Sequence, residues 1–286
     1  MRRKKKPLAG SGKEDSMSPR ARISDKGRAR KGRGKGHGRN YEPWIKVGDY
    51  PANVGFGDRV NGLISGRPTH TLSRLEFGEY LTLERWQDVV DIRENYPLPP
   101  GETKIVADRL GLRHPVERTT KQPKTLTIDL YLDILDNEGF LMHEAWDLKK
   151  KAHLALASYM RQIDIKEAYL AIYDTPYHIA TENEIDPILI KNYFLLRRYT
   201  GEYFSAQHLA QINHLEKLLW QELKDSREPA AHVCTRIDIQ QGYRQGTCLS
   251  TVYYLIYHRY WQVDLYEEIR PDEGPLKLYR LKAVED

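Results

Sequence analysis

Cysteines and long apolar runs are the two features that this 286-residue sequence most clearly lacks. Its only cysteines, Cys234 and Cys248, are too few for a thiolate zinc site or a disulfide framework, so a reducing cytoplasm is the simplest setting. No apolar run approaches the ~18 residues that span a membrane. The basic N-terminus also has no apolar segment behind it, as a secretory signal would. We therefore expect a cytoplasmic protein without membrane contact.

Charge is divided sharply along the chain. Residues 1–40 hold 15 Lys and Arg against 3 Asp and Glu, a net charge of +12, whereas the other 246 residues hold 30 against 37, a net charge of −7. The first segment is also rich in glycine and poor in large apolar side chains, so it cannot bury enough surface to fold alone. We predict that residues 1–40 form a basic, flexible arm that neutralises nucleic-acid phosphates. A merely solubilising terminus is the alternative.

The segment 126–149 reads as two strands around a turn. Residues 137–139 end in glycine and fit a three-residue hairpin loop, with the glycine in the left-handed conformation after a type I turn. This loop places Asp129 opposite Asp147. Asp147 and Lys149 are two residues apart, so their side chains share a strand face. The hairpin is therefore predicted to gather two carboxylates and an ammonium group on one surface.

Metal-dependent phosphodiester hydrolysis needs such a set of side chains. Carboxylate oxygens hold hard cations such as Mg²⁺, the cation polarises the phosphate and activates water, and a nearby lysine orients the nucleophile. The simpler alternative is an antiparallel hairpin with one solvated polar face. Asp133 is expected to share a face with Asp129, so spacing alone does not choose between these two aspartates.

The order of elements predicts two units. The first is a mixed α/β layer fold, with a helix, a strand, the hairpin, a second helix and a buried strand, at 71–85, 89–93, 126–149, 152–161 and 169–173. The second begins near Asp186-Pro187, with helices and then strand-like segments at 187–198, 205–224, 247–258, 261–267 and 276–281. Helices followed by a hairpin resemble a winged helix. The aromatic side chains of its last helix favour core packing or protein contact over base reading.

Three ordered motifs resemble the TnsA family of transposase endonuclease subunits. They are GRGKGHGRNYEPW at residues 32–44, LSRLE at 72–76 followed by DIRENYPL at 91–98, and HPV at 114–116. The resemblance covers roughly residues 31–185, and beyond residue 186 it depends on architecture. It implies a restriction-endonuclease-like catalytic domain at residues 41–185 and a mainly α, winged-helix-like interaction domain at residues 186–286.

The resemblance also implies the site. Carried over by position, the catalytic residues are Glu76, Asp129, Asp147 and Lys149, and some family members have glutamine where Asp147 stands. The metal ligands are expected to be Glu76, Asp129, Asp147 and the carbonyl of Leu148, around up to two Mg²⁺ ions or Mn²⁺ in their place. From the residues alone, Glu76 also matches a capping box with Ser73. Glu79 and Glu84 compete with it on the same helix.

The function implied by this resemblance is cutting of the 5′ strands at transposon ends. The expected partners are double-stranded DNA, a TnsB-type transposase that cuts and joins the 3′ ends, and a TnsC-type ATPase regulator on which the C-terminal domain docks. The expected location is the bacterial cytoplasm, in association with DNA. Two alternatives are a stand-alone restriction or repair nuclease and a non-catalytic DNA-binding adaptor. Target-site choice, the end sequence and the oligomeric state are not predicted.

Overall fold

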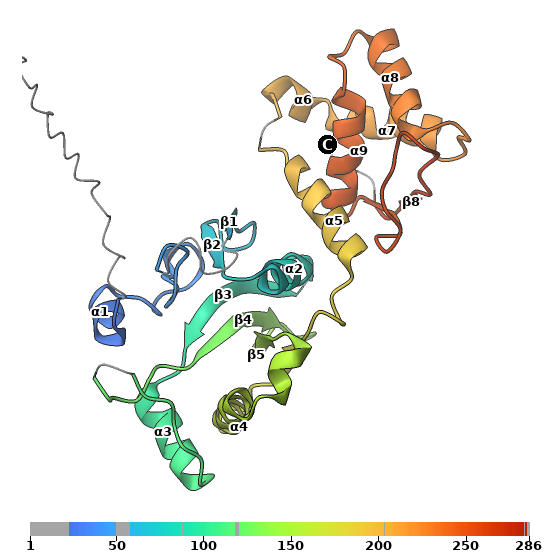
Figure 1. The fold of residues 1–286 in the computed structure, drawn as a ribbon. Coiled ribbons are helices and arrows are strands. Elements are labelled where there is room, and N and C mark those ends of the chain that lie inside the picture. The colour runs from blue at the N-terminus through green and yellow to red at the C-terminus, as the bar shows by residue number, and fades with distance from the viewer. Residues whose placement is uncertain are drawn as a thin grey trace, which may run out of the picture.

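Two lobes meet at helix α5 (Pro187–Leu196) in the computed structural model of the chain (Figure 1). The structure describes residues 23–49, 58–86, 88–117, 120–202, 204–282 and 284. Residues 1–22 of the predicted arm therefore lie outside the described residues. None of the described helices is long and apolar enough to cross a membrane.

A four-stranded mixed sheet forms the centre of the N-terminal lobe. Its order is β3 (Val89–Pro97), β4 (Thr127–Leu135), β5 (Leu141–Leu148) and β6 (Tyr177–Ala180). The first three strands pair antiparallel, and β6 pairs parallel with β5. A small antiparallel pair, β1 (Asp58–Asn61) and β2 (Pro68–Thr71), precedes the sheet in the chain. This mixed α/β arrangement is compatible with a restriction-endonuclease-like fold.

Helices cover both faces of this sheet. On one face, α2 (Arg74–Leu83) packs its apolar side chains against Leu130, Leu132 and Leu148 of the sheet. On the other face, Val106 of α3 (Pro100–Arg109) and Tyr169 of α4 (Ala157–Ala171) pack against Tyr131 and Ala145. A short 3-10 helix, η2 (Lys151–Ala155), links β5 to α4. Apolar residues of β4 thus face both layers, which is why its sequence reads as nearly continuous hydrophobic.

The β4–β5 hairpin has the predicted loop and register. Paired residues run from Leu135 opposite Leu141 to Leu130 opposite Trp146. The N–H of Asp136 donates to the carbonyl of Phe140 at 2.9 Å, which closes a three-residue loop. Gly139 has a φ of 86° within that loop, the left-handed conformation that glycine adopts most readily. Extending this register by one residue brings Asp129 level with Asp147.

The segment before Tyr41 is packed against the body from residue 23 onward. It contains α1 (Asp25–Arg30) and the 3-10 helix η1 (Gly38–Asn40). Asp25 accepts a hydrogen bond from the N–H of Thr125 at 2.7 Å, and the N–H of Gly38 donates to Asp91 at 2.8 Å. Arg33 forms an ion pair with Asp49. The folded body therefore begins well before residue 40, because polar contacts, which composition does not reveal, hold this segment.

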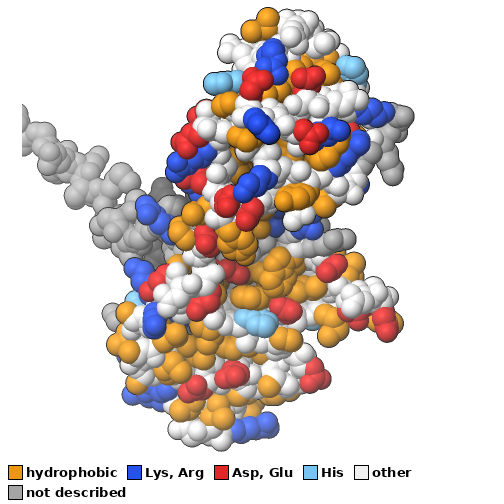
Figure 2. Space-filling model, turned by 90° about the vertical axis from the view of Figure 1, so that its right-hand side faces the viewer, with side chains coloured by type: hydrophobic (Ala, Val, Ile, Leu, Met, Phe, Trp, Pro, Cys, Tyr) orange, Lys and Arg blue, Asp and Glu red, His pale blue; other side chains and the backbone are white. Residues whose placement is uncertain are grey.

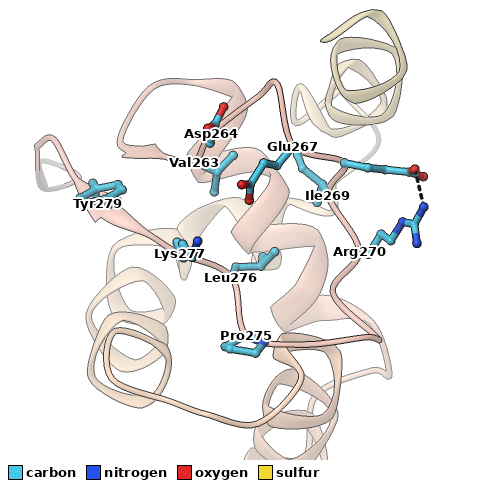
Figure 3. A pocket seen from close by; sticks show the side chains of 10 residues that line it. Val263, Asp264, Glu267, Ile269, Arg270, Pro275, Leu276, Lys277 and Tyr279 are labelled. Carbon is cyan, nitrogen blue, oxygen red and sulfur yellow. Dashed lines mark hydrogen bonds and ion pairs between the residues drawn. The ribbon is translucent and has the colours of Figure 1, made fainter. Parts of the chain in front are cut away.

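The C-terminal lobe is mainly helical. Its elements are η3 (Arg197–Tyr199), α6 (Ala206–Ala210), α7 (Ile212–Leu223), α8 (Ala230–Gln241), α9 (Thr247–Tyr257), β7 (Trp261–Gln262) and β8 (Tyr279–Arg280). Helices α7, α8 and α9 share a core with Trp261, in which the free thiols Cys234 and Cys248 are buried. The terminal hairpin is antiparallel but has only two residues in each strand. Beside it, a hollow of about 270 Å³ lies between residues 263–270 and 275–279 (Figure 3).

Several elements differ from the prediction, among them the strands expected at 261–267 and 276–281, of which only Trp261–Gln262 and Tyr279–Arg280 form. Residues 169–173 are not a buried strand: Tyr169 and Leu170 belong to the last turn of α4, and the strand follows at β6. A short apolar run fits a buried helix face as well as a strand, and here the helix continues through it. Helices α3 and α8 were not predicted, although Pro100 begins the first and Gly242, in the left-handed conformation, ends the second.

Candidate active site

The site predicted from the sequence lies where β4 and β5 separate. Beyond the last paired residues, the N–H of Asp129 donates to Oδ1 of Asp147 at 3.1 Å, and the N–H of Leu148 donates to Oδ2 of Asp129 at 2.8 Å. Carboxylate oxygens thus take the place of carbonyls as partners of these backbone N–H groups. Both aspartates are fixed between the strand ends, and the backbone satisfies part of their hydrogen-bonding capacity.

Lys149 reaches back over the same point. Its Nζ lies 2.5 Å from Oδ2 of Asp129, 3.2 Å from the carbonyl oxygen of Leu148 and 3.9 Å from Oδ1 of Asp147. Burial by itself would lower the pKa of Lys149, but the charges of Asp129 and Asp147 outweigh it and raise that pKa above its ordinary value. One ammonium group therefore contacts three oxygen atoms from the predicted metal-ligand set.

Glu76 is both a helix-capping residue and a neighbour of this group. Its N–H donates to the cap residue Ser73 at 3.1 Å, and its Oε2 accepts from the N–H of Leu72 at 2.8 Å. Glu76 therefore does take part in capping the start of α2. Its carboxylate, however, accepts from Leu72, the residue before the cap residue Ser73, and not from Ser73 itself. Burial raises the pKa of Glu76 to about 8, and the negative charge of Asp129 adds to the shift. The Glu76 carboxyl thus lies close enough to Asp129 to feel its charge.

Asp147 is neutralised from the other side of the sheet. Its Oδ2 accepts from Nζ of Lys166 at 2.5 Å and from the hydroxyl of Tyr177 at 2.6 Å. Burial alone would raise the pKa of Asp147, but the ammonium groups of Lys166 and Lys149 lower it to about 2. Sequence reasoning missed Lys166 and Tyr177. The signal for Lys166 is a lysine at an apolar spacing of α4, between Ile163 and Leu170, and it appears only once that helix is known to continue to residue 171.

The competing carboxylates lie in other surroundings. Asp133 binds Arg93 and lies 2.9 Å from Nδ1 of His143. Glu84 accepts from the hydroxyl of Tyr80 at 2.8 Å and pairs with Arg197. Glu79 is buried, and burial raises its pKa to about 7. The structure thus brings Asp129, Asp147 and Lys149 into contact and leaves these three alternatives outside the group, while Glu76 is connected to it through the effect of the Asp129 charge on its pKa.

The donor atoms of this group suit a hard divalent cation. Asp129, Glu76 and the Leu148 carbonyl offer oxygen ligands, which is the set that Mg²⁺ and Mn²⁺ prefer. With Glu76 ionised, three carboxylates face the two ammonium groups of Lys149 and Lys166, so one negative charge remains. Burial is the main cause of the raised pKa of Glu76, and the positive charge of Lys149 offsets only part of it. Asp147 contributes less as a ligand because Lys166 and Tyr177 occupy one of its oxygens.

Comparison with known proteins links this geometry to one family. Residues 184–265 match the family model described as TnsA endonuclease C terminal. The chain is 32% identical over 246 residues to the transposon Tn7 transposition protein TnsA of Escherichia coli, a match that covers 86% of this chain and 87% of that protein. The similarity therefore extends over both lobes and includes the segments that carry the predicted site. On this evidence, the chain belongs to the TnsA family.

Proposed function

We propose that this protein is the endonuclease subunit of a heteromeric cut-and-paste transposase and cuts the 5′ strands at transposon ends. The observation that carries the proposal is the convergence of Asp129, Asp147 and Lys149 where two strands separate, with the charge of Asp129 acting on Glu76, in a member of the TnsA family. The substrate is double-stranded DNA, and the reaction is hydrolysis of a phosphodiester bond.

Each residue has a role that its contacts support. Asp129 and Glu76, with the carbonyl of Leu148 and a lesser share from Asp147, hold up to two Mg²⁺ ions, or Mn²⁺ in their place. When bound, such an ion polarises the phosphate and lowers the pKa of water. Lys149 donates hydrogen bonds that position the attacking water and stabilise developing negative charge. Asp147, anchored by Lys166 and Tyr177, positions Asp129 by accepting its backbone N–H.

The division of labour along the chain is also proposed. The restriction-endonuclease-like catalytic domain is centred on residues 41–185, with residues 23–40 packed against it and α5 covering its helix α2, and the basic N-terminal residues bind DNA phosphates. On the face shown in Figure 2, acidic and basic side chains alternate over the upper, C-terminal lobe, whereas hydrophobic side chains gather on the lower one. Such mixing of charge suits protein contact better than phosphate contact.

Residues 186–286, with a winged-helix-like order of elements, dock on a TnsC-type ATPase regulator, and a TnsB-type transposase cuts and joins the 3′ ends. The aromatic side chains of α9 are less available for such docking than the sequence suggests, because Tyr253 is buried and its aromatic neighbours pack against the core. The exposed side chains of Tyr266, Tyr279 and Leu281 offer a better contact surface. Tyr279 lies at the outer end of the hollow in Figure 3.

The test of the proposed site compares two aspartates of the same hairpin. Asp129→Asn removes a charge from the site, whereas Asp136→Asn changes a turn residue that accepts from the N–H groups of Glu138 and Phe140, a role that asparagine retains. In a reaction with a transposon-end plasmid, Mg²⁺ and the partner proteins, Asp129→Asn should lose 5′-strand cutting and Asp136→Asn should keep it. Cutting retained by a folded Asp129→Asn protein would refute the site.

The same reaction separates the alternative functions. A stand-alone nuclease cuts the plasmid without the partner proteins, whereas a transposase subunit is nearly inert alone. A non-catalytic adaptor binds the transposon ends equally well with and without Mg²⁺ and never nicks them. Omitting the partners, and then Mg²⁺, therefore distinguishes all three functions with one substrate.

A further inference from the structure

A second group of metal-ligating side chains lies on the same sheet, away from the proposed nuclease site. One ligand atom each from His37, Asp91 and Asp133 lies within 4.8 Å of the others. His37 precedes η1, Asp91 belongs to β3 and Asp133 to β4, so three separate segments meet here. Asp133 is four residues along β4 from Asp129, a separation of about 13 Å at strand spacing.

The surrounding contacts orient these three side chains. The N–H of Gly38 donates to Oδ2 of Asp91 at 2.8 Å, which brings the neighbouring His37 to the sheet. Arg93 binds Oδ1 of Asp133, so Oδ2 is left facing Nδ1 of His37 at 3.6 Å. The Arg93 guanidinium is itself held 4.9 Å from the ring centres of Tyr96 and Tyr131. Asp133 therefore presents one oxygen to the group in a fixed direction.

One buried oxygen of this group lacks a partner. Oδ1 of Asp91 is fully buried and forms no hydrogen bond with any described residue. Leaving a buried polar atom unsatisfied costs about 1–3 kcal/mol, and more for a charged group. The side chain of His37 is 71% exposed, so the group is open to solvent at this residue. The buried Oδ1 of Asp91 thus has no cationic or hydrogen-bonding partner among the described residues, and the group is open enough for an ion to enter.

We propose that His37, Asp91 and Asp133 bind one divalent transition-metal ion of the Zn²⁺ type, with water completing its coordination. Nδ1 of His143 lies 2.9 Å from Oδ1 of Asp133, the oxygen that Arg93 also binds, so His143 helps to orient this carboxylate from β5. Imidazole and carboxylate ligands together suit Zn²⁺, whereas an all-oxygen set suits Mg²⁺. The two aspartates and Arg93 sum to one negative charge, which the ion offsets.

The ion would act as a structural clamp. It joins the segment that carries His37 to two adjacent strands, β3 and β4, and that segment connects the basic N-terminal residues to the body. The three ligands are far apart in the sequence, which is why no zinc-like spacing is visible there.

The test uses the full-length, tag-free protein after removal of metal by a chelator. Zn²⁺ alone is titrated in competition with a chromophoric chelator, and melting temperature is followed in parallel. The wild-type protein should bind one equivalent tightly and melt at a higher temperature with Zn²⁺. His37→Ala should weaken binding by about tenfold or more, because changes merely to the neighbours of metal ligands already cost 10–100-fold. It should also lose the rise in melting temperature.

Two variants make the result specific. His214→Ala changes a histidine of the C-terminal lobe, outside the proposed ligand set, and should bind Zn²⁺ like the wild type. Asp129→Asn alters the proposed nuclease site and should also retain Zn²⁺. Absence of tight Zn²⁺ binding by the wild type would overturn the proposal, as would equal binding by His37→Ala. Loss of the ion in Asp129→Asn would place it at the nuclease site instead.

Discussion

Lys166 and Asp147 form a buried ion pair whose two charges cancel beside the proposed active site. Lys166 is 5% exposed and Asp147 is fully buried, so neither charge has water to stabilise it without the other. Glutamine, which some family members have in place of Asp147, is neutral. We therefore infer that the ion pair of Asp147 and Lys166, whose net charge is zero, is electrostatically equivalent to one neutral glutamine amide. Oδ1 of Asp147 still accepts the backbone N–H of Asp129 and so positions that residue.

The first prediction tests this equivalence with a double-mutant cycle. Lys166→Met leaves a buried carboxylate with less compensation and should lower the free energy of unfolding by about 3 kcal/mol. Asp147→Gln alone should also destabilise the protein, because Lys166 is then buried without its carboxylate. The double variant should recover most of the loss, since both charges are gone. Urea unfolding measures all four proteins. Strictly additive losses would show that the two side chains act independently.

The second prediction concerns pH and Glu76. Because the pKa of Glu76 is about 8 in the folded protein and near 4.5 when unfolded, its folded form holds a proton that the unfolded form has lost. Its contribution to stability is therefore complete below about pH 4.5 and declines as pH rises to about 8. Glu76→Gln keeps the hydrogen bond from Leu72 but cannot ionise. Without divalent ions, it should melt above the wild type at pH 8 and close to it at pH 5.

Mg²⁺ should reverse this order. An ion held by Glu76 and Asp129 favours the ionised carboxylate, so at pH 8 it should stabilise the wild type more than Glu76→Gln. The same variant should lose strand cutting. If Glu76→Gln cuts DNA normally and responds to Mg²⁺ as the wild type does, this residue serves only the start of α2, as the capping alternative holds.

Among the elements, the β4–β5 hairpin depends on one glycine for its loop. Gly139 has a φ of 86° and open space where a Cβ would stand, so any cost of alanine there is conformational rather than steric. The third prediction is that Gly139→Ala lowers the free energy of unfolding by about 1 kcal/mol or more. Gly101→Ala is the control, because this residue also has open space but lies in the first turn of α3 without a positive φ. It should be neutral or stabilising. Equal effects in urea unfolding would contradict the argument.

Local signals explain why the hairpin was predictable and other elements were not. Turn chemistry and the two-residue period of a strand fix the register, so Asp129 and Asp147 could be placed together from sequence alone. Lys166 and Tyr177 meet Asp147 only after α4 and β6 have folded onto the sheet, and no spacing in the sequence encodes that meeting. Glu76 likewise could be identified only through the family resemblance, because the position of its side chain relative to Asp129 depends on how α2 crosses the sheet.

At the scale of the whole molecule, helix α5 belongs to both lobes. Ile190 packs against Gly78 of α2, and the ring of Phe194 meets that of Phe77 with centres 5.9 Å apart. The side chain of Asn192 meanwhile donates to the carbonyls of Leu265 and Glu267 at 2.9 and 2.8 Å in the C-terminal lobe. Figure 1 shows α5 between the two lobes. A boundary at residue 186 would therefore separate α2, which carries Glu76, from the helix that covers it.

The fourth prediction follows from this shared helix. Ile190→Ala in the full-length chain should cost about 2 kcal/mol of unfolding free energy, because it opens a gap beside Gly78. Ile188→Ala is the matched control on the same helix: its side chain is 38% exposed, so it should cost well under 1 kcal/mol. Urea unfolding followed by tryptophan fluorescence measures both.

A pair of truncated proteins extends the same argument to the domain boundary. A fragment that ends at residue 200 keeps α5 and its apolar cover over α2, whereas one that ends at residue 185 exposes Gly78 and Phe77. Burial of a large apolar side chain is worth about 1.5–3 kcal/mol, so the longer fragment should unfold at a clearly higher urea concentration and should retain more Mg²⁺ binding at Glu76. Equal unfolding midpoints for the two fragments, together with equal effects of Ile190→Ala and Ile188→Ala, would mean that α5 belongs to the C-terminal lobe alone.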